Sequence, residues 1–107
     1  MAIDNTEVID ATAYEGNKLI LQLYDHLEFD DEIINDHMLM LQDKLNAYIW
    51  FIDSKQYEET YPDASLSVYE IQIKFKYQPP DFCIEYLNHV DNKLGSMNIR
   101  VVYEVTD

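Results

Sequence analysis

Residues 67–77 read SVYEIQIKFKY and form the most regular pattern in the chain. Hydrophobic and polar side chains alternate through this segment, which is the period of a β-strand with one buried side and one side in water. The apolar side carries Tyr69, Ile71, Ile73, Phe75 and Tyr77. The segment therefore predicts a sheet with one covered face, and the rest of the chain must supply the other strands and the cover.

Three further segments read as strands. Residues 8–14 and 18–24 are short apolar runs on either side of a turn that contains Gly16 and Asn17. Because both turn residues tolerate a positive φ, these runs predict a β-hairpin. Residues 98–105 alternate as residues 67–77 do, and their apolar side carries Ile99, Val101, Tyr103 and Val105.

Two segments repeat apolar residues at intervals of three and four, which is the period of an amphipathic helix. The first runs from Glu32 to about Ser54, with Asp30 or Asp31 as its N-cap. Its apolar stripe consists of Ile34, Met38, Leu41, Leu45, Tyr48 and Ile52. The second covers residues 81–94, is capped by Gly95, and has a stripe of Cys83, Leu87, Val90 and Leu94.

The element order is therefore β-β-α-β-α-β in a chain of 107 residues, a length that suits one domain over residues 1–107. Strands with one polar face and helices with one apolar stripe favour an α+β two-layer sandwich. We expect an antiparallel or mixed four-stranded sheet with both helices on one face. The last two strands should be parallel if they are adjacent, joined by a right-handed crossover.

The chain is strongly acidic, with 21 acidic and seven basic residues and a formal net charge of −14. A hydrophobic content of 48% shows that this charge belongs to a folded protein and not to a disordered acidic tail. Binding to DNA or RNA needs a basic surface, so direct nucleic-acid binding is not expected. A basic protein would be attracted to such a surface, although acidity also serves solubility alone.

Cellular context follows from what the sequence contains. The single cysteine, Cys83, cannot form an internal disulfide, which fits a reducing compartment. No apolar run reaches the length needed to span a bilayer, and the first ten residues are acidic where a secretion signal is basic. We therefore expect a cytoplasmic protein without a membrane segment.

Most of the chain resembles a family of small bacterial proteins described only as a domain of unknown function. The resemblance lies in residues 8–10 (VID), 25–27 (DHL), 41–48 (LQDKLNAY), 51–52 (FI) and 61–64 (YPDA). It implies a bacterial cytosolic protein and supplies no activity, cofactor or catalytic residue. The sequence departs from the family at Phe29, where the resemblance leads us to expect a larger aromatic such as Trp.

One segment has residues suited to metal binding or acid–base chemistry. It contains Asp25, His26, Glu28, Asp30, Asp31, Glu32 and His37. The spacing of a calcium loop is absent, because Leu27 stands at the second ligand position and Asp30 at the turn glycine. The simpler interpretation is a solvated helix start, with Asp25 or His26 fixing the turn that precedes it. Of the other candidates, His37 and His89 read as residues at the core boundary, and Cys83 as a small buried residue.

The remaining candidate is a surface that combines aromatic and acidic side chains, namely Trp50, Phe51, Tyr57, Glu58, Glu59, Tyr61 and Asp63. Tyr and Trp are common anchors of protein interfaces, and acidic neighbours favour a basic partner. Our leading hypothesis is a non-enzymatic protein that binds a basic protein partner, with neutralisation of a toxin as one specific form. It requires no metal, cofactor or catalytic residue.

Two alternatives and one question of assembly stay open. The segment from Asp25 to His37 could serve a small-ligand or metal-dependent enzyme. The carboxylates could instead mimic the charge of nucleic acid and occupy a DNA-binding protein. The sequence also leaves open homodimerisation through Trp50 or through an uncovered sheet edge.

Overall fold

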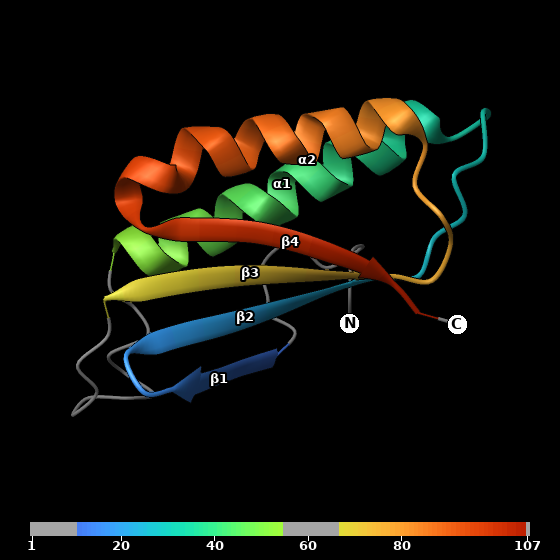
Figure 1. The fold of residues 1–107 in the computed structure, drawn as a ribbon. Coiled ribbons are helices and arrows are strands. Elements are labelled where there is room, and N and C mark those ends of the chain that lie inside the picture. The colour runs from blue at the N-terminus through green and yellow to red at the C-terminus, as the bar shows by residue number, and fades with distance from the viewer. Residues whose placement is uncertain (1–10, 55–66, 107) are drawn as a thin grey trace.

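The computed structural model describes residues 11–54 and 67–106, which form a four-stranded sheet with two helices (Figure 1). The elements are β1 (Ala11–Glu15), β2 (Lys18–Asp25), α1 (Ile34–Asp53), β3 (Val68–Phe75), α2 (Asp81–Leu94), a 3₁₀ turn (Gly95–Met97) and β4 (Ile99–Val105). The α+β class and the predicted order β-β-α-β-α-β are confirmed. Residues 8–10 of the predicted first strand lie outside the described residues.

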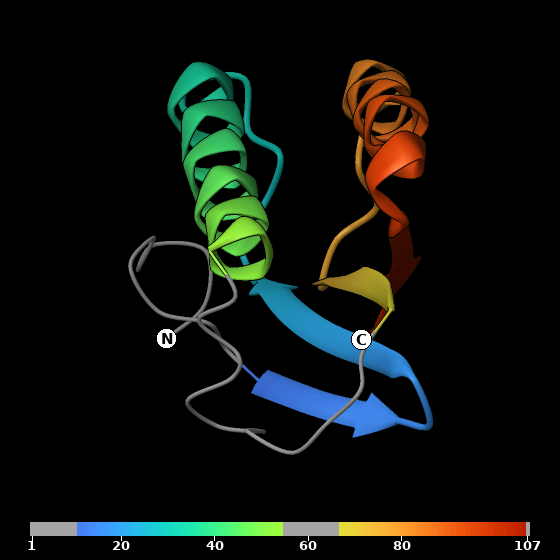
Figure 2. The ribbon, with the colours of Figure 1, turned by 90° about the vertical axis from the view of Figure 1, so that its left-hand side faces the viewer.

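The sheet is mixed, and its strands follow the order β1-β2-β3-β4. β1 and β2 form the predicted hairpin, whereas β2, β3 and β4 are parallel neighbours. Each parallel pair is joined through one helix, and such crossovers are almost always right-handed. Since both crossovers advance across the sheet in the same direction, both helices lie on the same face, as Figure 2 shows.

The core lies between this face and the helices. β2 contributes Leu19, Leu21 and Leu23, which are fully buried, as predicted from their alternation. The alternate residues Ile71, Ile73 and Phe75 of β3 are also fully buried. The helices supply Leu41, Leu45, Tyr48 and Ile52 from α1, and Cys83 and Leu87 from α2.

The four apolar residues predicted on one face of the last strand share that face, but only its first half is covered. Ile99 and Val101 are buried, but Tyr103 and Val105 on the same face are 37% and 40% exposed. β4 is an edge strand, so these side chains have a neighbouring strand on one side only. The period of two placed them correctly on a face, but it does not reveal how far that face is covered.

The ends of the helices also differ in detail from the sequence prediction. Asp30 caps a turn, because its carboxylate accepts the N–H of Glu32 at 3.0 Å and its C=O accepts the N–H of Ile33. α1 therefore begins at Ile34, two residues after the predicted start. α2 ends before Gly95 as predicted, but Gly95 keeps a right-handed φ of −57°, and the left-handed residue is Asn98, with a φ of 62°.

The predicted hairpin turn is present, but only one of its two residues has a positive φ, since Asn17 does not. Gly16 has a φ of 63°, in the region that glycine adopts without steric cost.

Across residues 11–54 and 67–106, no helix combines the length and the apolar composition needed to cross a bilayer.

Candidate functional site

The predicted acidic segment does not assemble into one site. Asp25 and His37 are buried, whereas His26, Glu28, Asp30, Asp31 and Glu32 are exposed. Within residues 11–54 and 67–106, no three His, Cys, Asp or Glu side chains are grouped so that they could hold a metal ion. The segment is thus divided between a buried pair and a solvated turn.

The buried pair joins the end of β2 to the second turn of α1. The Oδ2 atom of Asp25 lies 2.6 Å from Nε2 of His37, and its Oδ1 accepts the N–H of Leu27 at 3.1 Å. Both side chains of the pair are fully buried. Asp25 therefore fixes the turn after β2, as predicted, while the placement of His37 at the core boundary was wrong, since its side chain lies inside the core.

The hydrogen bonds assign the tautomer of His37. A carboxylate accepts hydrogen bonds, so Nε2 is assigned as the N–H that donates to Asp25. The other ring nitrogen, Nδ1, is buried and has no hydrogen-bond partner in the described part of the chain. The ring of Phe29 stacks on the imidazole with its centroid 4.2 Å away. Both side chains are fully buried, so the pair is a structural link between β2 and α1. A hollow of about 240 Å³ lies next to it, lined by Tyr24, Asp25, His26, Lys74, Lys76 and Thr106.

Cys83 of α2 lies in the same part of the core and is fully buried. Burial raises the pKa of its thiol to about 12, and the negative charge of Asp25 adds to the effect. Cysteine, histidine and aspartate are the residue types of some nucleophilic sites, but such a nucleophile needs a thiolate. Here the surroundings stabilise the protonated thiol, which supports the prediction of Cys83 as a small core residue.

The protonated thiol leads to a testable reactivity. At pH 8 we expect Cys83 of the folded protein to react with dithionitrobenzoate about 100-fold more slowly than in the guanidinium-unfolded chain, since burial limits both access and ionisation. Absorbance at the thionitrobenzoate band measures both rates. Equal rates in the two states would contradict this assignment.

The raised pKa of Cys83 also affects stability at alkaline pH. Above the ordinary thiol pKa of 9.0 the unfolded chain loses this proton while the folded protein keeps it, until pH reaches about 12. The contribution of Cys83 to the free energy of unfolding is therefore complete below pH 9.0 and is lost as pH rises through this window. A Cys83→Ala variant should show a shallower decline over the same pH range.

Only part of the predicted aromatic and acidic surface falls within the described residues. Trp50 is 61% exposed, whereas Phe51 is half-buried and packs against the core. The other predicted members, Tyr57, Glu58, Glu59, Tyr61 and Asp63, lie outside the described residues.

Trp50 belongs instead to a different set of residues, which we call the outer stripe of α1. Its members are exposed and recur at intervals of three and four, so they share the helix side that faces away from the core. The outer stripe consists of Asp36, Leu39, Asp43, Asn46, Trp50 and Asp53. From the sequence, Trp50 was assigned to the other predicted surface and Leu39 was not singled out, although the polar positions opposite the core stripe carried the signal.

The carboxylates of the outer stripe have no positively charged side chain beside them on the exposed side of α1. The helix contains two side chains able to carry positive charge, His37 and Lys44, and both are buried on its opposite side. Lys44 lies over the ring of Tyr48, with its Nζ 5.9 Å from the ring centroid. As a result, α1 presents three carboxylates and two large hydrophobic side chains to solvent, and no cation.

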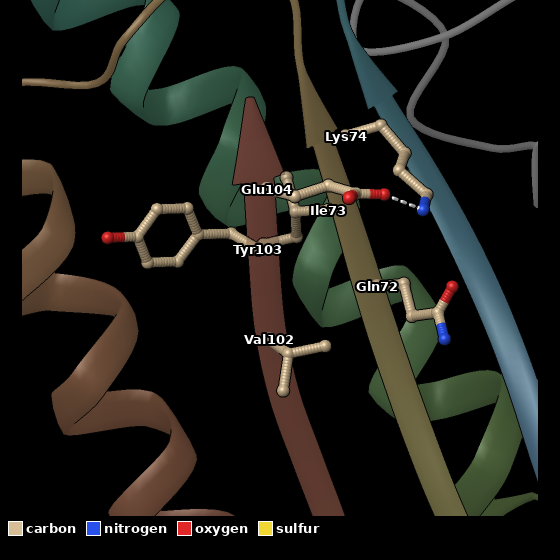
Figure 3. Close-up of a pocket in the computed structure, with 6 residues that line it drawn as sticks. All are labelled: Gln72, Ile73, Lys74, Val102, Tyr103 and Glu104. Carbon is tan, nitrogen blue, oxygen red and sulfur yellow. Dashed lines mark hydrogen bonds and ion pairs between the residues drawn. The ribbon is translucent and has the colours of Figure 1, made fainter. Parts of the chain in front are cut away.

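The sheet face opposite the helices is different, because it carries ion pairs of Lys18 with Glu70 and of Lys74 with Glu104. Gln22 donates to Gln72, and Gln72 donates to Glu70, so hydrogen bonds link β2 to β3 across this face. Lys74 pairs with Glu104 of β4, next to a hollow of about 220 Å³ (Figure 3). The hollow is lined by Gln72, Ile73, Lys74, Val102, Tyr103 and Glu104.

Comparison with known proteins identifies the family but no activity. A family model described as a family of unknown function (DUF6572) matches residues 1–107. The chain belongs to this family. No curated protein and no solved structure matches this DUF6572 chain. The predicted resemblance to a family of unknown function is therefore confirmed.

In this DUF6572 chain, Phe29 occupies a defined position beside the buried pair. It stacks on His37, and its ring centroid lies 5.7 Å from that of Phe75. Phe29 thus separates the Asp25–His37 link from solvent. The departure noted at this position in the sequence affects packing and leaves the ligand-type residues unchanged.

Proposed function

We propose that this protein is a non-catalytic interaction protein and that the outer stripe of α1 binds a basic protein partner. The supporting observation is the composition of that stripe: Asp36, Asp43 and Asp53 alternate with exposed Leu39 and Trp50, without a cation. Charged groups around apolar anchors are the usual arrangement of a specific interface, in which the charges guide association and the anchors provide affinity.

The geometry of the stripe supports one continuous contact. Leu39 and Trp50 are eleven positions apart, which is about three helical turns, so they project in nearly the same direction. Asp43 lies between them on the same side. A partner with two apolar contacts and Lys or Arg between them would match this order. A formal net charge of −14 would increase its rate of association.

The alternative of an enzyme that uses the Asp25–His37 segment is less well supported. Both side chains of the pair are fully buried, and the adjacent Cys83 thiol is held protonated. An acid–base catalyst must come within hydrogen-bonding distance of its substrate, directly or through one water. The full burial of both side chains supports a structural role instead.

Mimicry of nucleic-acid charge is also less well supported. Asp36 and Asp43 are seven residues apart, about 10 Å along the helix, whereas one DNA strand carries a phosphate every ~3.4 Å. Leu39 is exposed between them, where a phosphate backbone has no apolar group. This spacing favours a partner with an apolar docking surface.

The proposed setting is the cytoplasm of a bacterium. The single buried thiol of Cys83 is compatible with a reducing compartment. Neutralisation of a basic toxin is one form that such a role can take. It would require a tightly bound partner.

The experiment compares two double variants that change the net charge equally. Asp36→Lys with Asp43→Lys alters the outer stripe, while Glu15→Lys with Glu85→Lys alters exposed positions elsewhere. Wild type and both variants are used to capture proteins from the source organism's lysate at low and high salt. We expect one basic protein to be retained by wild type and by the control, and its capture to fall about tenfold or more with the stripe variant.

Two outcomes would count against the proposal. If both double variants lose the partner equally, overall charge and not the outer stripe governs capture. If no protein is retained specifically at either salt concentration, the binding role itself is contradicted. Circular dichroism of each variant establishes that it is folded.

A further inference from the structure

The outer edge of β4 provides a second surface of distinct chemistry. β4 is the last strand of the sheet and pairs with β3 on one side. Asn98 accepts the N–H of Tyr69, and Thr106 donates its N–H to Phe75, so both point their backbone groups toward β3. The direction of the backbone N–H and C=O groups alternates from one residue to the next along a strand. The odd-numbered residues of β4 therefore point these groups away from the sheet.

α2 covers the first part of this edge. The carboxylate of Asp91 accepts the outward N–H of Val101 at 2.8 Å and pairs with Arg100 at 3.0 Å. The N–H of Val101, together with Arg100, holds the pKa of Asp91 below its usual value. A side chain that caps an edge N–H in this way prevents pairing with another strand at that position.

The second part of the edge has no such cover. Tyr103 and Val105 are 37% and 40% exposed, and no described residue accepts their outward N–H groups. The side chains beside them differ between the two faces of the sheet. Tyr103 and Val105 present an apolar border on the helix face, while Glu104 is 55% exposed on the opposite face, beside the hollow of about 220 Å³.

We propose that the open end of the β4 edge, at Tyr103 and Val105, receives an extended segment of a basic partner as a fifth strand. Strand addition satisfies the outward backbone groups, and alternate side chains then contact the two faces. The matching segment alternates apolar residues, beside Tyr103 and Val105, with a Lys or Arg beside Glu104, whose side chain is 55% exposed even while it pairs with Lys74. A second copy of the chain fits less well, because each copy carries a formal net charge of −14.

This inference is separate from the proposed role of the outer stripe, since β4 and the exposed side of α1 share no residue.

The probe is a blocked synthetic peptide of alternating lysine and valine, about seven residues long. A matched probe has the same sequence with N-methyl groups along one backbone edge, which removes its ability to pair. Amide hydrogen exchange and nitrogen–proton NMR spectra of the full chain report binding residue by residue.

The expected result is protection confined to the open part of the edge. At saturating peptide, exchange of the Tyr103 and Val105 amides should slow about tenfold or more, while the Val101 amide, already bound to Asp91, changes little. The N-methylated peptide should give no protection. If the plain peptide perturbs only α1, or if both peptides bind equally, the edge is not a strand-addition site.

A pair of variants tests the backbone hydrogen bond itself. Val105→Pro removes an outward N–H and leaves the β3 pairing of Glu104 and Thr106 in place, whereas Val105→Ala shortens the side chain and keeps the N–H. We expect the proline variant to bind the peptide about fivefold more weakly than the alanine variant. Equal affinities, or a β4-paired dimer of the free protein, would overturn the proposal. The N-methylated probe decides the question without a variant if Val105→Pro does not fold.

Discussion

Asp25→Ala is expected to lower the free energy of unfolding by about 3 kcal/mol, which corresponds to a fall of about 15 °C in the melting temperature. The substitution removes the acceptor of two hydrogen bonds, one from His37 and one from the N–H of Leu27. The Nε2–H of His37 then remains fully buried without a partner, and an unsatisfied buried donor costs more than the bond itself contributed.

The control for Asp25→Ala is its neighbour. His26 is exposed, so His26→Ala should change the free energy of unfolding by no more than about 0.5 kcal/mol. Urea denaturation followed by circular dichroism measures both variants. Equal midpoints for Asp25→Ala and His26→Ala would show that the buried pair is not a structural link.

Phe75→Ala is expected to have an even larger effect, a loss of about 4 kcal/mol in the free energy of unfolding. Phe75 is fully buried at the end of the central strand β3. Its ring contacts that of Phe29, which covers His37, and lies edge-on to Tyr103 of β4 at 6.0 Å. Its removal would therefore leave a cavity beside the buried pair and below the exposed end of β4.

Phe82→Ala provides a matched comparison for Phe75→Ala, because it removes the same atoms from a side chain that is 50% exposed at the start of α2. We expect it to cost about 1 kcal/mol. Thermal and urea unfolding of both variants measure the difference. Similar losses for the two would mean that the sheet and helices do not enclose the core described above.

Much of the fold could be predicted from periodicity because each main element has one buried side. The alternation through Ile71, Ile73 and Phe75 predicted β3 and its covered face, and the stripe through Leu41, Leu45 and Tyr48 predicted the inner side of α1. The parallel arrangement of β3 and β4 also followed from the intervening helix, through the usual crossover geometry. The positive φ of Gly16 followed from its side chain, which is only a hydrogen atom.

The buried pair could not be predicted in the same way. His37 lies on the inner side of α1 with Leu41 and Lys44, but a polar residue at an inner position normally indicates the edge of a stripe. The burial of His37 depends on Asp25, twelve positions earlier, which accepts a hydrogen bond from the imidazole. The turn after β2 brings the two side chains together. Such a partnership is a tertiary contact, which a period of two or of 3.6 residues does not contain.

The candidate surfaces were predictable to different degrees. Trp50 is exposed and stood out in the sequence, but its companions Asp36 and Asp43 required attention to the polar side of the helix. The open end of β4 depends on which strand lies at the edge of the sheet. That order follows from how the crossovers stack the strands and not from any single segment.

Trp50 offers the most direct test of the central claim, which is that the outer stripe of α1 binds a basic protein. It is the only tryptophan in the chain, so fluorescence excited at the indole band reports from this surface alone when the partner contains no tryptophan or is analysed by difference. Titration with the captured partner should shift the Trp50 emission to shorter wavelength and saturate at a one-to-one ratio as the indole leaves water. A partner that binds with an unchanged Trp50 emission would contradict the claim.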